Sequence, residues 1–76
     1  MNPIAPSPER LWTMRRNGRS FSAEISSGQR GWELRFVADG KWFASDVLES
    51  RERAIRSARE MHANLAAIGW VDETSA

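Results

Sequence analysis

Two dipeptides, Asn17-Gly18 and Asp39-Gly40, constrain the fold of this 76-residue chain more than any other feature. Both central residues of a two-residue type I′ turn need a positive φ, which Asn, Asp and Gly tolerate best. Each dipeptide lies between segments in which apolar and polar residues alternate, as they do in strands with one buried face. The pattern therefore predicts two β-hairpins, which supply four short antiparallel strands.

The spacing around the first turn predicts its strand register. A two-residue turn at Asn17-Gly18 places Met14 opposite Phe21 and Trp12 opposite Ala23. All four side chains then share one face. A slip of one residue would move them all to the other face, so this register is well specified.

Regular pairing in the second hairpin gives a similar apolar face and a distinctive opposite face. The apolar face holds Phe36 opposite Phe43, Trp32 opposite Val47, and Leu34. The opposite face holds Val37 opposite Trp42, Glu33 opposite Asp46, Ala44 and Arg35. An exposed tryptophan beside an arginine is typical of a recognition surface.

A helical pattern follows the hairpins. Ser50 is a good N-cap, and Gly69 with Trp70 fits a Schellman motif that ends the helix after Ile68 and folds Trp70 back onto Leu65. The apolar positions recur at steps of three and four and form one stripe: Ala54, Ala58, Met61, Leu65 and Ile68. This stripe is expected to cover the aromatic face of the sheet.

These elements predict the α+β class, with a four-stranded antiparallel sheet of two β-hairpins and one C-terminal α-helix packed on one face (ββββα). The length suits one domain, here residues 9–71, with a flexible arm at 1–8 and a disordered tail at 72–76. No apolar run approaches membrane-spanning length, so no membrane partner is expected. The lack of cysteine fits a cytoplasmic protein.

Charge is distributed unevenly along the chain. Seven basic and three acidic residues lie between Arg10 and Lys41, a net charge of +4, although the whole chain carries only +1. Arginine accounts for all but one of the basic residues, and its planar guanidinium suits phosphate, guanine or carboxylate. A high-GC genome favours arginine equally well, so this bias alone does not identify a partner.

Residues that could support catalysis are few. His62 is the only histidine, and its position beside the apolar stripe is typical of a side chain packed at the sheet edge. No nucleophile elbow, phosphate-binding glycine loop or metal-ligand spacing occurs in the sequence. We therefore expect no enzyme activity, no cofactor and no metal.

Three segments resemble a known family of DNA-binding domains. They are Gly31-Trp-Glu-Leu-Arg-Phe, Asp39-Gly40-Lys41 and Leu48-Glu-Ser-Arg-Glu-Arg-Ala-Ile-Arg-Ser-Ala, about half of the chain. Together they resemble the amino-terminal arm-binding domain of phage-type tyrosine integrases and are similar to the plant ethylene-response-factor domain. The resemblance implies that the sheet enters the DNA major groove, with Arg35 and Trp42 as contacts and Lys41 at the turn. The chain also resembles small bacterial proteins that end in Gly-Trp after an arginine-rich helix, which implies no function.

Two functions remain open from the sequence. The first is a non-enzymatic module that binds nucleic acid through the exposed sheet face. The second is a protein-interaction module, such as an adaptor, an inhibitor or a homodimer. The candidate binding residues are the same for both: Arg15, Arg35, Val37, Lys41 and Trp42.

Overall fold

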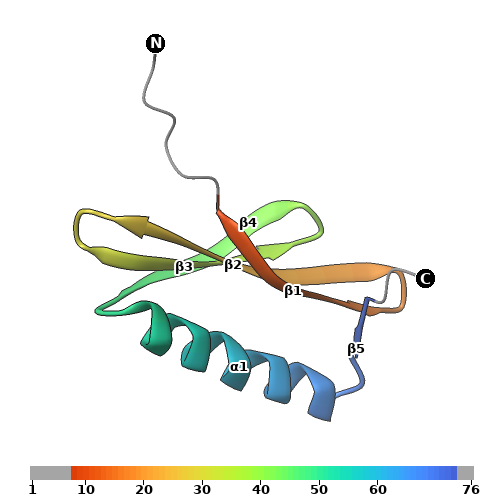
Figure 1. The fold of residues 1–76 in the computed structure, drawn as a ribbon. Coiled ribbons are helices and arrows are strands. Elements are labelled where there is room, and N and C mark those ends of the chain that lie inside the picture. Colours follow the sequence, from red (N-terminus) through yellow and green to blue (C-terminus); the bar gives the residue numbers. More distant parts are fainter. Residues whose placement is uncertain (1–7, 74–76) are drawn as a thin grey trace.

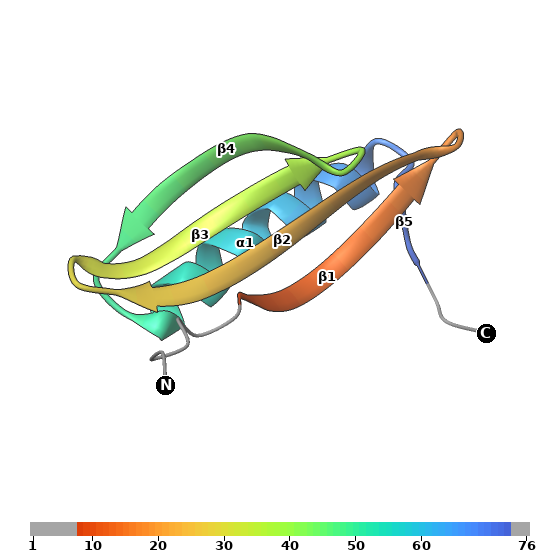
Figure 2. The ribbon, with the colours of Figure 1, turned by 90° about the horizontal axis from the view of Figure 1, so that it is seen from above.

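The computed structural model describes residues 8–73, which form an antiparallel sheet with one helix packed against it (Figure 1). The elements are β1 (Glu9–Arg16), β2 (Arg19–Gly28), β3 (Gly31–Ala38), β4 (Lys41–Leu48), α1 (Arg51–Ala67) and β5 (Val71–Asp72). The strand order is β4-β3-β2-β1-β5, so neighbouring elements in the chain mostly lie side by side (Figure 2). The predicted α+β class is confirmed, and β5 is an addition to it.

Both predicted turns and the first register are confirmed. Asn17 and Asp39 each have a φ of 53°, the left-handed geometry of a type I′ turn. Met14 lies opposite Phe21, and Trp12 lies opposite Ala23. Further along β1, an irregularity between Arg10 and Trp12 adds one residue, which places Arg10 opposite Glu24. The turn chemistry therefore sets the register close to each turn.

A β-bulge at Phe43 changes the second hairpin. Val37 lies opposite Trp42, as the sequence predicts, but the register shifts at the next residue and Phe36 lies opposite Ala44. The predicted pairing of Phe36 with Phe43 is wrong, and Phe43 is 57% exposed instead of buried. The extra residue of a bulge reverses the face that each later residue in the strand occupies. Ala44, expected on the opposite face, consequently lies on the side of α1.

Beyond the bulge, each partner moves by one position. Trp32 lies opposite Leu48 instead of Val47, and Glu33 lies opposite Val47 instead of Asp46. Two carboxylates directly across a strand pair repel each other, and the shifted register removes that contact. It also brings Leu48 against the core and leaves Val47 exposed. The bulge thus separates the two carboxylates and exchanges Val47 for Leu48 at the core, while Phe43 and Val47 become exposed.

Both predicted caps of the helix are present, although the last helical residue is Ala67 and Ile68 is the C-cap. The Ser50 hydroxyl accepts a hydrogen bond from the Arg53 amide at 3.1 Å. At the other end, the Trp70 amide donates to the Leu65 carbonyl at 3.0 Å and the Gly69 amide donates to the Ala66 carbonyl at 3.2 Å, which is the Schellman pattern. The Trp70 ring packs against the core, with its centroid 6.1 Å from that of Phe21.

The chain then returns to the sheet. Val71 and Asp72 form β5, which pairs with Arg15 and Met14 of β1. The Glu73 amide donates to the Thr13 carbonyl at 2.8 Å. Asp72 and Glu73 therefore belong to the sheet and not to the expected tail. The remainder of that tail, residues 74–76, and most of the expected arm, residues 1–7, lie outside the described residues.

The core lies between α1 and the sheet. Trp12, Trp32 and Met61 are half-buried at its margins. Ile68, expected in the buried stripe, is 61% exposed because the last helical residue is Ala67 and the chain turns away there. The buried apolar residues are Met14, Phe21, Ala23, Ile25, Leu34, Phe36, Ala54, Ala58 and Leu65.

Candidate interaction surface

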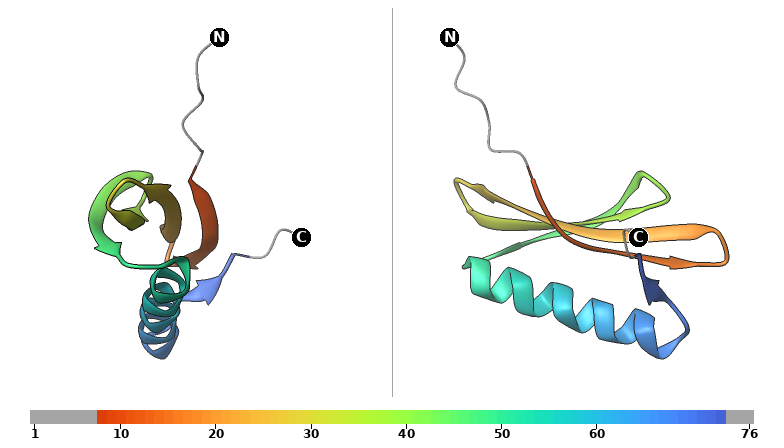
Figure 3. Two further views of the ribbon diagram at one scale, coloured as in Figure 1. Left: turned by 60° about the vertical axis from the view of Figure 1, so that its left-hand side comes forward. Right: turned by 45° about the vertical axis from the view of Figure 1, so that its right-hand side comes forward.

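The sheet face opposite α1, here called the outer face, has no described element packed on it (Figure 3). One continuous row crosses it from β1 to β4: Thr13, Ser22, Val37 and Trp42. Ser22 is only 5% exposed because it is a small side chain between larger neighbours. Val37 is half-buried, and Trp42 is 67% exposed. The row thus ends in the most exposed large apolar side chain of the described residues.

Arginines surround this row, and carboxylates on the same face neutralise them. Arg10 bonds Glu24 at 2.8 Å, and Arg35 bonds Glu33 at 3.2 Å. Arg35 also lies opposite Glu24 of β2. The Glu24 carboxylate therefore has an arginine partner on each of the two neighbouring strands, β1 and β3. The outer face therefore combines apolar side chains with charges that are already paired.

Two of the predicted site residues lie apart from this group. Arg15 is on the outer face, but β2 separates it from Val37, and its guanidinium bonds Glu73 at 2.8 Å. Lys41 is exposed at the turn, opposite Ala38. The structure brings together Arg35, Val37 and Trp42, and it leaves Arg15 and Lys41 at the margins.

The bulge adds a residue that the sequence reasoning missed. Val47 now lies on the outer face, in register with Glu33, and is 52% exposed. Phe43 is 57% exposed but does not join the outer face, because its ring packs edge-on to Phe21 of the core with centroids 5.5 Å apart. Apolar residues on both faces of the segment from Trp42 to Leu48 are a signal that could have indicated an irregular strand.

The Asp39 carboxylate is held by hydrogen bonds from the neighbouring hairpin. Its carboxylate accepts from the Ser20 amide at 2.9 Å and from the Arg19 guanidinium at 3.1 and 3.2 Å. The Ser20 hydrogen bond, and then the Arg19 hydrogen bond, hold the pKa of Asp39 below its ordinary value. This network ties the β1–β2 turn to the β3–β4 turn, at the end of the sheet that carries Lys41.

The acidic and histidine side chains of residues 8–73 are dispersed, apart from one close pair. No set of three or more histidine or acidic side chains there could hold a metal ion. His62 contacts Asp72, with Nε2 and Oδ1 2.6 Å apart, and its ring lies edge-on to Trp12 at 5.3 Å. No helix in this part of the chain is long and apolar enough to cross a membrane.

Comparisons of the chain with protein-family models, curated proteins and solved structures find no match.

Proposed function

We propose that this chain is a non-enzymatic protein-interaction module that binds its partner through the outer face, with Trp42 as the central anchor. The exposure of Trp42, at 67% beside the half-buried Val37, is the observation that carries the proposal. Tryptophan and arginine contribute most of the binding energy in many protein interfaces, and burial of an exposed tryptophan removes a large apolar area from water.

The pairing of charges favours a protein over a nucleic acid at this face. Nucleic-acid affinity depends on cations that displace counterions from phosphates. Arg10, Arg15 and Arg35 each have a carboxylate partner, so the outer face offers little net positive charge. A protein surface accepts such paired charges at the rim of an apolar centre.

Site-specific crosslinking tests the proposal directly. We would place the photo-reactive residue p-benzoylphenylalanine at position 42, where it keeps an aromatic side chain, and irradiate the cells that naturally make the chain. The matched control places it at position 63, an exposed alanine of α1. We expect a discrete protein adduct from position 42 and none from position 63. An adduct with a second copy would identify a homodimer, and one with another protein would identify an adaptor or inhibitor. A nucleic-acid adduct, or no adduct, would contradict the proposal.

Nucleic acid is the second candidate because Lys41 is exposed beside Trp42 and forms no ion pair among the described residues. A base can stack on an exposed indole while a lysine contacts the neighbouring phosphate. Tryptophan fluorescence in a salt titration with single- and double-stranded DNA tests this candidate. Binding that weakens steeply with salt, and that Lys41→Gln makes less salt-dependent, would favour it over a protein partner.

A further inference from the structure

A groove runs between α1 and β1 on the side of the molecule away from the outer face. The helix packs mainly on β2, β3 and β4, and β1 lies to one side of it (Figure 2). The resulting cavity has a volume of about 360 Å³. Its walls are Leu11 and Trp12 from β1, and Ile55, Ala58, Arg59 and His62 from α1. Four of these six side chains are apolar, so the groove suits an apolar guest.

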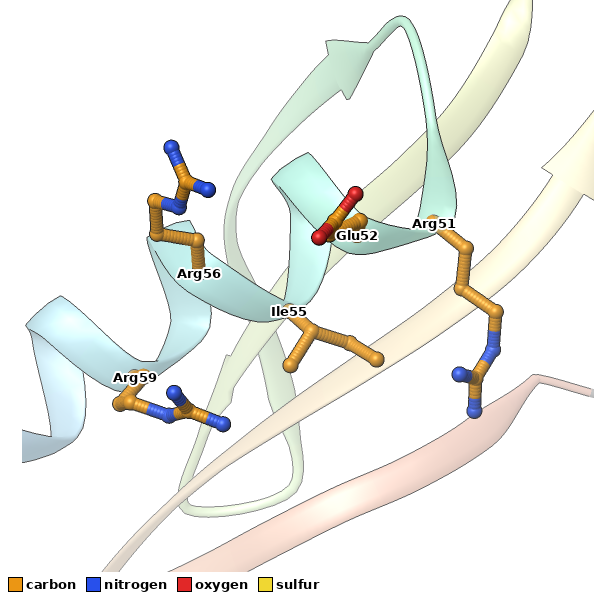
Figure 4. Close-up of a pocket in the computed structure, with 5 residues that line it drawn as sticks. All are labelled: Arg51, Glu52, Ile55, Arg56 and Arg59. Atoms are coloured by element: carbon orange, nitrogen blue, oxygen red, sulfur yellow. The ribbon is translucent and has the colours of Figure 1, made fainter.

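A second hollow of about 440 Å³ continues the groove toward the start of α1. The two hollows share Ile55 and Arg59 in their walls and therefore adjoin, and together they are called the channel here. Figure 4 shows Arg51 and Arg59 extending from the same side of the helix as Ile55, as expected for residues four apart. The channel therefore alternates between apolar and cationic side chains along its length.

The cations of the channel are only partly neutralised. Arg51 bonds Glu9 at 3.0 Å, whereas Arg56 and Arg59 form no ion pair with any described residue. Glu52 is the single carboxylate that lines either hollow. This differs from the outer face, where the arginines are paired. An unpaired guanidinium beside an apolar pocket is suited to a carboxylate next to an apolar group.

The floor of the channel also has an unused donor. The indole N–H of Trp12 is buried and has no hydrogen-bond acceptor among the described residues. Buried donors are nearly always satisfied, so one without a partner calls for an explanation. The N–H lies beneath the surface of the groove, so a peptide carbonyl reaches it only when the Trp12 ring shifts, and a purely hydrocarbon guest offers no acceptor at all.

We propose that this groove binds a short acidic segment of a partner protein. An apolar side chain of the segment occupies the space between Trp12 and Ile55, and a neighbouring carboxylate binds Arg59. The charge of the channel selects an acidic segment over a basic one. This surface is separate from the outer face, so it does not depend on the proposed role of Trp42.

The experiment is an NMR titration of the ¹⁵N-labelled chain with a capped model peptide, Asp-Glu-Leu-Phe-Asp-Glu, at low salt. We expect shifts at Leu11, Ile55 and the Trp12 indole N–H, with the indole proton moving as it gains an acceptor. A second peptide with Gly-Ser in place of Leu-Phe tests the apolar anchor and should bind about tenfold more weakly or worse. Laurate and a DNA duplex test the other guests for the same surface.

Substitutions give the matched comparison. Arg59→Glu should weaken peptide binding about tenfold or more, and Arg59→Gln should have an intermediate effect. Arg53→Glu makes the same charge change on the same helix, outside the groove, and should have little effect. Trp42→Ala should leave the titration unchanged, which separates this proposal from the outer-face function. The proposal would be overturned if the peptide caused no shifts, or if the shifts lay on the outer face. It would also be overturned if the two peptides bound equally, or if laurate or DNA bound more tightly at the groove. Arg59→Glu and Arg59→Gln without any effect would contradict it as well.

Discussion

The imidazole Nε2 of His62 on α1 lies 2.6 Å from the carboxylate Oδ1 of Asp72 on β5. This contact connects the last strand to the helix that precedes it. The same strand is held on its other side by β1, through the pairing of Val71 with Arg15. A two-residue strand has too few ladder bonds to be stable alone, so these side-chain contacts matter for its position.

Removal of the Asp72 carboxylate should loosen β5 with little effect on the rest of the fold. Asp72→Ala is expected to cost at most about 1 kcal/mol of the free energy of unfolding, since the pair is partly exposed. Hydrogen exchange at the Glu73 amide, which donates to the Thr13 carbonyl, should become faster. Asp46→Ala, on the opposite edge of the sheet, is the control and should leave that amide unchanged.

Truncation of two apolar residues near the end of α1 should change stability by very different amounts. Leu65 is 9% exposed and lies in the core, so Leu65→Ala should destabilise the fold by about 2–5 kcal/mol. Ile68 is 61% exposed, so Ile68→Ala should change stability by about 0.5 kcal/mol or less. Urea denaturation measures both. Equal losses of stability in the two variants would show that the helix is rotated about its axis and presents another face to the sheet.

Trp42 should contribute little to the stability of the isolated chain. Trp42→Ala is expected to change the free energy of unfolding by about 1 kcal/mol or less, because the side chain lies outside the core. Phe36→Ala, on the adjacent strand and 8% exposed, should cost about 3–5 kcal/mol. Guanidinium denaturation of both variants makes the comparison. An unfolded Trp42→Ala variant would place this indole in the core and refute its role as an anchor.

Asp39 should make stability depend on pH in the acid range. Its pKa is lower in the folded chain than its ordinary value, so its charged form stabilises the fold above that value. This contribution is lost as the pH falls through the lower, folded pKa. Asp39→Asn keeps a residue suited to the type I′ turn but removes the titration. The variant should therefore lose less stability than the natural chain between pH 5 and pH 2, roughly the span of a depressed carboxyl titration, as followed by thermal unfolding.

The elements that local chemistry controls could be predicted from the sequence. Asn17 and Asp39 adopt the positive φ that their turns require, and Ser50 caps the helix. The Schellman motif, which brings Trp70 against the core, could also be predicted because its hydrogen bonds involve only nearby residues. These signals are short in range, and no distant part of the chain competes with them.

The bulge at Phe43 and the strand β5 depend on contacts between distant residues. Odd-numbered and even-numbered positions of β4 both carry apolar side chains. The alternation of the sequence alone therefore does not decide which set of side chains faces α1. The choice between Val47 and Leu48 is made by the helix that covers the sheet. Similarly, the pairing of Val71 with Arg15 arises from the direction in which the helix ends. The sequence placed Trp42, Val37 and Arg35 together on the outer face, but it did not place Val47 there, for the same reason.

The bulge on β4 also interrupts an edge of the sheet at which another strand could otherwise pair. β4 is an edge strand, and a regular edge can add further strands without limit, as in a growing fibre. Phe43 interrupts the regular spacing of the free backbone groups there, and Lys41 and Asp46 place charges along the same edge. Assembly through the outer face instead buries one patch on each copy and is complete once two copies have met. The irregular edge therefore disfavours open-ended growth through β4.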